Sequence, residues 1–405
     1  MAQKRVLLVA QNFYPEFFKS NDIAQELVSR GHHVDVLTGI PNYPEGVFYK
    51  GYGIFSRRVD EYCGAKVYRA YQLPRGRKPG AIRLSINYLS FALTTTFWIL
   101  FFFVFKRRYD AIIVHQTSPI TQAWPALLLR AIRRTPIYTW VLDIWPDSVL
   151  AFLSKPPRFV EAPLRWFTNL VYRRSKRILI SSPDFRALVN RDDDYNDKII
   201  DFPNWCDDIL AMPEQDVPTL RKGFNIMLAG NMSDATGIES VVEVIRKTSV
   251  NPDIQWVFVG GGNRVEWLTN SIKEHQLEHC CTIAGRFPFS HMSSLYRQAD
   301  VMFISLKPTD YPHLTATIPA RLQSYIAAGK PVIGMIGHGV ANLINEIGCG
   351  MCAEAGDSDR CAEIILSVAQ NREMLAQWSK NARKYYLEHF TKDRCMTHLE
   401  KILSE

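Results

Sequence analysis

The sequence predicts an α/β protein of two domains, each built around a mostly parallel sheet, and three observations support this prediction. A chain of 405 residues exceeds one typical domain. Apolar runs of strand length alternate with helical patterns, beginning with a strand at 5–10, a helix at about 21–30 and a strand at 33–38. A looser stretch follows residue 204, and a second alternating series starts at 224. We therefore predict an N-terminal domain of residues 1–204 and a C-terminal domain of residues 205–389.

Composition and charge narrow the classes of partner. The hydrophobic fraction is 47% and the formal net charge is +8. An excess of positive charge favours nucleic acid, an anionic membrane face or phosphorylated substrates. The eight cysteines follow no regular framework, which favours a reducing compartment, and the early strand argues against a signal peptide. Cys349 and Cys352 form a CxxC without a matching second pair, so we interpret them as buried thiols and predict no zinc site.

The stretch TATIPARLQSYIAAGKPVIGMI, residues 315–336, dominates the C-terminal domain. Pro319 suits the first turn of a helix over 320–328, Gly329 suits its C-cap, and a buried strand follows at 331–336. Free amides at this helix start, with nearby hydroxyls and a guanidinium, predict a seat for a phosphate or diphosphate. An ordinary helix–strand unit is the alternative. The side chains of the predicted seat are Thr315, Thr317 and Arg321.

Glycine or a cation follows each strand of the C-terminal series. Ligands of parallel sheets bind beyond the carboxyl ends of the strands, and glycine lets the backbone approach them closely. One such turn is weak evidence, but several in one series predict a ligand site. The turn residues are Gly230, Asn231, Gly261, Gly262, Arg286, Phe287 and Lys307.

The N-terminal series places polar residues at the same edge of its sheet. The strand at 137–142 runs into Asp143, which we expect to act as a base or to position a hydroxyl. Asp147 caps the helix that follows, and the acidic run 192–194 fits a solvated loop better than a metal site. We therefore predict no metal. The other predicted ligand contacts of this domain are Lys19, Ser20, Asn21, Thr117 and Trp145.

Residues 86–105 pass without a charge and are bordered by basic residues on both sides. Twenty apolar residues could span a bilayer, but the next strand must rejoin the same sheet, and a span would separate them. We therefore predict a helix that lies in the cytoplasmic leaflet of an anionic membrane, with a core helix and a true span as alternatives. Its predicted membrane contacts are Trp98, Phe101, Phe102 and Phe103.

A second basic amphipathic pattern lies around Pro163 and Trp166, with Phe167, Leu170 and Val171 at helical spacing. It fits a second membrane contact and an ordinary domain helix equally well.

Several motifs carry a resemblance to a known family. NFYPE, DIWPDS, VFVGGGNR, IPARLQSY and YIAAGKPVIG resemble the GT-B glycosyltransferases of the retaining family 4, and more narrowly the bacterial L-fucosamine-type (N-acetylfucosaminyl) transferases of O-antigen and capsule assembly. The resemblance covers nearly the whole chain. It implies two Rossmann-like domains facing across a cleft, with acceptor bound by the first and nucleotide-sugar by the second. It also implies a last helix, at about 390–405, that crosses back to the N-terminal domain.

The resemblance implies the following activity. A sugar such as N-acetyl-L-fucosamine passes with retention from a UDP-sugar to a polyprenyl-diphosphate-linked saccharide at the cytoplasmic side of the inner membrane. No cofactor, metal or nucleic acid takes part. We expect Asp143, Arg321 and Lys307 to act in catalysis, and Ile318, Pro319 and Ser324 to complete the donor site.

The chain departs from the family pattern at the donor side. The two family glutamates fall on Ala316 and Ser324, the family's basic pair falls on Asn231 and Thr236, and its histidine falls on Leu142. The diphosphate must therefore be held by other residues, among them Arg321, Lys307 and Arg286. A nucleotide-sugar 2-epimerase and a membrane-tethered nucleotide-sugar binder without catalysis are the alternative functions.

Overall fold

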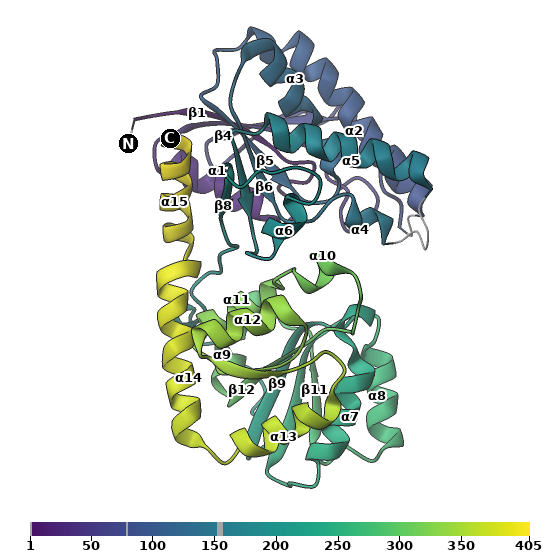
Figure 1. The fold of residues 1–405 in the computed structure, drawn as a ribbon, viewed down its shortest axis with the longest axis vertical. Helices are drawn as coiled ribbons and strands as arrows, with labels where there is room; N and C mark the ends of the chain where they lie inside the picture. Colours follow the sequence, from purple (N-terminus) through teal and green to yellow (C-terminus); the bar gives the residue numbers. More distant parts are fainter. Residues whose placement is uncertain (1, 78–79, 152–156) are drawn as a thin grey trace. The chain divides into compact units, whose positions relative to one another are not determined.

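The protein is described by a computed structural model, which covers residues 2–77, 80–151 and 157–405. The chain forms two compact units (Figure 1). Unit 1 comprises Met1–Phe202 together with Met396–Glu405, and unit 2 comprises Pro203–Cys395. Each unit is a Rossmann-like α/β domain with a largely parallel sheet, which confirms the predicted fold class.

Unit 1 has an eight-stranded sheet in the order β3-β4-β2-β1-β5-β6-β7-β8. Its strands pair in parallel except for β3, which is antiparallel to β4. The central strands β1 and β5 are buried along almost their whole length, so their apolar residues follow one another without alternation, up to the polar His115 and Gln116 at the end of β5. The strands are β1 Arg5–Val9, β2 His33–Gly39, β3 Val59–Tyr62, β4 Ala65–Ala70, β5 Ala111–Gln116, β6 Ile137–Val141, β7 Arg177–Ile180 and β8 Ile199–Asp201.

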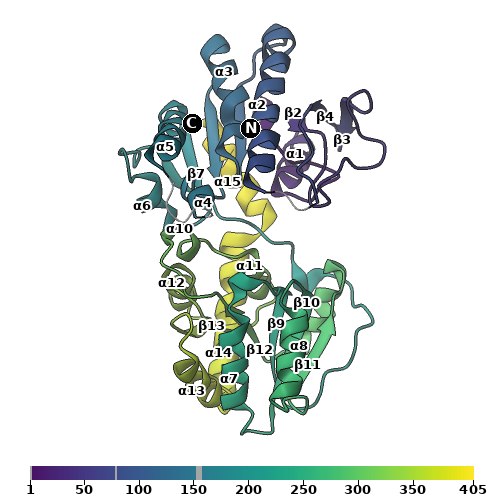
Figure 2. The same cartoon turned by 90° about the vertical axis from the view of Figure 1, so that its right-hand side faces the viewer.

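The helices of unit 1 form two layers. The connection from β1 to β2 runs in one direction along the sheet, and those from β4 to β5, β5 to β6 and β6 to β7 run in the other. Because parallel crossovers are right-handed, α1 covers one face while α2, α3 and α5 cover the opposite face (Figures 1 and 2). The helices are α1 Lys19–Ser29, α2 Ala81–Phe101, α3 Trp124–Arg133, α4 Asp147–Leu150, α5 Arg158–Arg174 and α6 Phe185–Val189.

Unit 2 has a six-stranded parallel sheet in the order β11-β10-β9-β12-β13-β14. Its strands are β9 Phe224–Asn231, β10 Ile254–Gly261, β11 Cys281–Gly285, β12 Val301–Ser305, β13 Val332–Met335 and β14 Gly350–Ala353. Its helices are α7 Ile238–Thr248, α8 Val265–Glu274, α9 Met292–Arg297, α10 Pro312–Thr315, α11 Ala320–Ala327, α12 His338–Ile347, α13 Ser358–Val368 and α14 Arg372–Tyr385. A π-helical turn, Tyr386–Phe390, leads to the last helix, α15 Lys392–Ser404.

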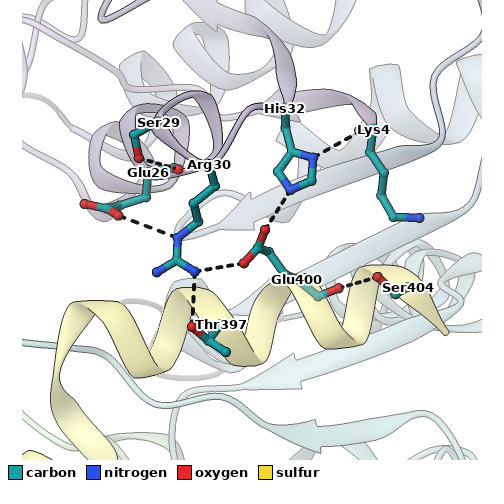
Figure 3. A network of polar contacts seen from close by, with 8 residues as sticks. All are labelled: Lys4, Glu26, Ser29, Arg30, His32, Thr397, Glu400 and Ser404. Atoms are coloured by element: carbon teal, nitrogen blue, oxygen red, sulfur yellow. Dashed lines mark hydrogen bonds and ion pairs between the residues drawn. The ribbon is translucent and has the colours of Figure 1, made fainter. Parts of the chain in front are cut away.

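The end of α15 packs onto unit 1 through a buried polar network (Figure 3). The Lys4 amide donates to His32 Nδ1 (3.1 Å), so the ring hydrogen sits on Nε2 and is donated to Glu400 Oε1 (2.9 Å). Arg30 Nη1 donates to Glu400 Oε2 (2.8 Å) and to Thr397 Oγ1 (3.1 Å). Burial acts to raise the pKa of Glu400, but the bonds from His32 and Arg30 outweigh it and lower the pKa. The network therefore fixes residues 396–405 as part of the first unit.

The apolar stretch departs from its predicted limits. The helix begins at Ala81, five residues before the predicted start at 86, and it ends at Phe101. Its C-cap is Phe102, where φ is −135° and ψ is −60°. A short 3₁₀ turn, Phe103–Phe105, then leads the chain back towards the sheet. Phe103 is buried and packs against Tyr68 and Tyr109, so its assignment as a membrane contact is wrong. It is a core residue because the chain must turn inward there to enter β5.

Candidate functional site

Both sheets contain a point where the strand order reverses, and open α/β sheets bind ligands at this place. In unit 2 the reversal lies between β9 and β12. These two strands pair only at Ile226–Val301 and Met227–Met302. Beyond these pairs the phenol of Tyr325 on α11 donates to the Ala229 carbonyl (2.7 Å) and accepts from the Ala229 amide (3.0 Å). The strands therefore part at their carboxyl ends, and α11 supplies the groups that fill the opening.

Glycines allow the backbone at the ends of β9 and β10 to come unusually close. A Cβ on Gly260 would lie 2.0 Å from the Gly230 carbonyl oxygen, and a Cβ on Gly262 would lie 2.0 Å from the Met232 carbonyl oxygen. Gly230, Gly260 and Gly262 all have φ between +131° and +144°, where a side chain is strained. The predicted glycine-bearing strand ends thus form one continuous surface of exposed backbone.

Arg321 lies against this surface. Its guanidinium is 3.8–3.9 Å from the position that a Cβ on Gly230 would take. Its Nη1 is buried and has no hydrogen-bond partner, and within the described part of the chain no carboxylate forms an ion pair with it. A buried guanidinium nitrogen without a partner costs free energy that an anionic ligand would recover. Helix α11 begins at Ala320 as predicted, with Pro319 as its N-cap, but it ends at Ala327 with Ala328 rather than Gly329 as its C-cap. The Leu322 amide donates to the Pro319 carbonyl (2.9 Å), so the amides of Ala320 and Arg321 are the first-turn donors left for a ligand.

The hydroxyls near Arg321 already form hydrogen bonds within the protein. Thr315 Oγ1 donates to the Pro312 carbonyl (3.0 Å) and Thr317 Oγ1 donates to the His313 carbonyl (2.7 Å). Ser324 is buried, donates to the Arg321 carbonyl (3.0 Å) and contacts the Tyr296 hydroxyl (3.2 Å). A phosphate needs donors, so these hydroxyls would have to rotate to bind it. Ile318 packs against the apolar core of the unit.

The remaining residues of the predicted nucleotide-sugar site surround the same strand ends. The Arg286 guanidinium covers Gly261, since a Cβ there would lie 1.9 Å from Arg286 Nε. Lys307 is exposed, and its amide donates to the Ala235 carbonyl (2.8 Å) beside the start of α7. Asn231 is exposed, and its Oδ1 lies 2.8 Å from a Cβ position on Gly262. Phe287 is half-buried and faces His291. Three cationic residues, Arg286, Lys307 and Arg321, therefore collect around a glycine-lined edge.

The reversal in unit 1 lies between β1 and β5 and has a different chemistry. Just beyond β1, Gln11 Nε2 donates to Gln72 Oε1 and to Asn87 Oδ1, both at 2.9 Å. Asn87 Nδ2 donates to the Leu73 carbonyl (2.5 Å), and the Gln11 amide donates to Gln122 Oε1 (3.0 Å). The side-chain oxygens of Gln11 and Gln116 are buried without a donor. This amide network was missed from the sequence, where isolated Gln and Asn residues show no pattern.

Asp143 lies at the end of β6 within a small cluster of hydroxyls. Its Oδ2 accepts a hydrogen bond from Ser118 and its Oδ1 accepts one from Ser148. Trp145 Nε1 donates to Ser118 Oγ (2.9 Å), so the structure brings Asp143 and Trp145 together as predicted partners at one edge. The two hydroxyls fix the carboxylate orientation and leave it further lone pairs for a ligand hydroxyl.

The other residues predicted to bind the acceptor lie at the start of α1 and, for Thr117, just after β5. Ser20 and Asn21 are buried, and Asn21 accepts from the Tyr14 amide (3.1 Å) and donates to the Glu16 carbonyl (2.7 Å). Lys19 forms an ion pair with Asp22 (3.7 Å), and Thr117 Oγ1 accepts weakly from Gln122 (3.4 Å). These side chains bond to other groups of unit 1, and their contacts stabilise the local structure.

Glu16 is a buried carboxyl that the sequence reasoning missed. Its Oε1 accepts from the amides of Asn42 and Tyr43, both at 2.6 Å, and its Oε2 has no partner. Burial raises the pKa of Glu16 to about 7, against the lowering effect of those amides. Glu16 belongs to the NFYPE motif, but the motif does not reveal that its carboxylate links the loop after β1 to the loop after β2.

Comparison with known proteins defines the class. Residues 20–205 match the glycosyl transferase 4-like domain, and residues 215–385 match the glycosyl transferases group 1. The chain therefore belongs to the glycosyltransferases, and its fold is that of the GT-B members of this class.

Individual relatives are distant. The chain is 24% identical over 192 residues to the amylovoran biosynthesis glycosyltransferase AmsK of Erwinia amylovora, which covers 41% of this chain and 46% of that relative. The alignment thus spans less than half of the curated relative. Among solved structures, sucrose-phosphate synthase from Thermosynechococcus elongatus has a TM-score of 0.74 at 15% identity, covering 99% of this chain and 98% of the other. HepE of Anabaena, solved in complex with UDP, has a TM-score of 0.69 at 15% identity and covers 100% of both chains.

Proposed function

We propose that the protein transfers a sugar from a UDP-sugar, with retention, to a saccharide carried on polyprenyl diphosphate. One observation supports the binding of the UDP-sugar by unit 2. The Nη1 of Arg321 is buried without a hydrogen-bond partner beside the glycine-lined ends of β9 and β10. That geometry suits a diphosphate, and related folds have been solved with UDP and with UDP-glucose.

The proposed chemistry is a displacement at the anomeric carbon. The bond from this carbon to the diphosphate breaks, and UDP leaves with the electron pair. The acceptor oxygen forms the new glycosidic bond on the same face that UDP leaves, which retains the configuration, and its proton passes to the departing diphosphate or to Asp143. The side chains of Arg321 and Lys307, with the amides of Ala320 and Arg321 at the start of α11, stabilise the charge that grows on the leaving group. Asp143 in unit 1 orients the acceptor hydroxyl or accepts its proton.

The sugar and the acceptor are finer parts of the proposal. N-acetyl-L-fucosamine is supported by the resemblance of the sequence motifs to transferases of that sugar. A polysaccharide-assembly role is supported by the relative named for amylovoran biosynthesis. A lipid-linked acceptor and a place on the cytoplasmic side of the inner membrane are supported by α2. The segment Ala81–Phe105 is the one helical region of the described chain that is long and apolar enough to cross a membrane, and only 22% of its most apolar window is buried.

Product analysis tests the proposal. The purified protein is incubated with a panel of labelled UDP-sugars, including UDP-N-acetyl-L-fucosamine, and a polyprenyl-diphosphate-linked saccharide. Transfer to the lipid fraction with the donor's anomeric configuration is the expected result. Conversion of the free nucleotide-sugar to its epimer without transfer would instead show a 2-epimerase. Saturable UDP binding without any turnover, with every acceptor tried, would show a binding protein.

A further inference from the structure

Helix α2 exposes an apolar stripe along its full length. Leu93, Phe97 and Phe101 are 72%, 63% and 65% exposed. The stripe lies opposite the buried side of the helix, which is formed by Asn87, Phe91, Thr95 and Ile99. A helix on the surface of a soluble domain carries polar residues on its outer face, so this stripe needs an apolar partner. Its members are Ile82, Ile86, Leu89, Leu93, Phe97, Leu100 and Phe101.

Helix α5 continues the apolar surface on the same side of the sheet. Its Phe159 and Trp166, seven residues apart, are 79% and 65% exposed. Trp124 at the start of α3 links the two helices. Its Nε1 donates to Thr96 of α2 (2.8 Å), and its ring lies 6.5 Å from the ring of Phe167 of α5. Of the pattern read from the sequence, Trp166 therefore faces outward and Val171 inward.

Cations without acidic partners lie at the end of the stripe. Arg133 donates to the carbonyls of Val104 (3.0 Å) and Lys106 (3.3 Å), and Arg108 donates to the Arg134 carbonyl (3.4 Å), so these side chains gather where α2 ends. In the part of the chain that the structure describes, no ion pair joins Arg107, Arg108, Arg133 or Arg134 to a carboxylate. Arginines elsewhere in unit 1, such as Arg173 and Arg191, are paired with aspartates.

We infer that α2 and α5 together form one docking surface for an anionic bilayer, with both helices lying in the plane of its cytoplasmic leaflet. The stripe and the α5 aromatics enter the acyl boundary, Trp124 sits at headgroup level, and the arginine cluster binds lipid phosphates. This inference specifies the membrane partner of the proposed function and rests on it for its biological setting. The docking itself requires no sugar substrate.

Two other arrangements fit the structure less well. A membrane-crossing α2 would break its inner contacts, because Arg83, Ser90 and Thr94 hydrogen-bond to backbone groups of Pro74, Leu73 and Tyr71. A second copy of the chain packed on the stripe would bury the apolar side chains, but the stripe of that copy carries no anionic group for the arginine cluster.

Vesicle flotation of the full chain tests the inference. The probes are phosphatidylcholine vesicles with and without phosphatidylglycerol. The wild type is expected to float with the anionic vesicles and much less with the neutral ones. Leu93→Asp should weaken binding by about tenfold or more, and Trp166→Asp by severalfold, since each places a charge in the acyl boundary. Charge reversal, Arg107→Glu with Arg108→Glu, should remove the preference for phosphatidylglycerol, at about fivefold per residue.

Controls make each outcome decisive. Val250→Asp changes a residue of unit 2 that is 76% exposed and should bind as the wild type does. Melting temperatures confirm that every variant is folded. If the variants Trp166→Asp and Phe159→Ser bind vesicles as tightly as the wild type does, α5 is not part of the docking surface. Equal binding to neutral vesicles would overturn the role of lipid charge. A dimer in solution that fails to float would assign the stripe to a second copy. A protein that floats but transfers no sugar would leave this inference standing and overturn the proposed function.

Discussion

The two strand-order reversals share one topology and differ in chemistry. In unit 2 the site has glycines at the strand ends, a guanidinium nitrogen without a partner, and exposed cations. In unit 1 it has a closed network of amides, from Gln11 to Gln72 and Asn87, and a carboxylate held by two serines. The first arrangement leaves a guanidinium donor and positive charge unsatisfied, and the second leaves the side-chain oxygens of Gln11 and Gln116 unsatisfied. An anion suits the first and a neutral hydroxyl suits the second.

The difference shows where specificity lies in this fold. Parallel sheets supply the opening, and the residues just beyond each strand decide what it attracts. Three changes in the chain and the removal of divalent metal would break or sharpen this contrast, and the largest effect is expected in unit 2.

Replacing Arg321 should cost the most activity. Because leaving-group charge grows in the transition state, Arg321→Ala should lower turnover by about a hundredfold or more. Arg321→Lys should recover only part of it, since an ammonium cannot reproduce the fork of donors. Steady-state kinetics and melting temperature together give the answer. A large fall in melting temperature with near-normal turnover would show that Arg321 is a structural residue. The anion-binding role given to unit 2 would then be wrong.

Glu16 should make unit 1 sensitive to pH. The pKa of Glu16 is about 7 in the folded chain against an ordinary value of 4.5, so the fold resists its ionisation. The contribution of this group to stability is therefore greatest below about pH 4.5 and falls as the pH rises to about 7, by at most roughly 3 kcal/mol.

The variant Glu16→Gln keeps an oxygen for the amides of Asn42 and Tyr43 but cannot ionise. Denaturation of the wild type and the variant at pH 5.5 and 8 should show a smaller loss of stability for the variant. Equal losses in both proteins would mean that Glu16 ionises normally.

Replacing Asn87 should lower the stability of unit 1 without changing the affinity of unit 2 for UDP. Asn87→Leu leaves Gln11 Nε2 and the Leu73 carbonyl each without one partner, which should lower stability by about 1–3 kcal/mol. UDP affinity should not change, because the donor residues belong to unit 2. Ser85→Ala, at an exposed position of α2, is the matched control and should be near neutral. A loss of UDP affinity in the folded variant would contradict the separation of the two sites.

Removing divalent metal should have the smallest effect. The anion site of unit 2 offers cations and amides, and among the described residues no group of three or more Asp, Glu, His or Cys could hold a metal ion. Turnover in chelator should equal turnover without it. Loss of activity in chelator that magnesium or manganese restores would show that the diphosphate is neutralised by metal instead.

The strand ends were the predictable part of the site, and the contacts between distant residues were not. Gly230, Gly262 and Arg321 could be placed because alternating apolar runs locate each strand and the polar residues follow directly. The partners of Asp143 come from two other segments, at Ser118 and Ser148, and no local pattern pairs them. Phe103 was misassigned because the apolar run continues past the helix end at Phe101, where neither glycine nor proline marks the stop.

The return of the chain to unit 1 has a consequence for how the protein is made. Residues 396–405 belong to the first unit, yet the ribosome adds them only after the about 190 residues of unit 2. At roughly 5–20 residues per second, this delay lasts on the order of ten to forty seconds. During that time the surface around Arg30 and His32 has no Glu400 to bind. The nascent first domain therefore stays incomplete until residues 396–405 have been made, and a chaperone or the membrane could bind the uncovered surface during that interval.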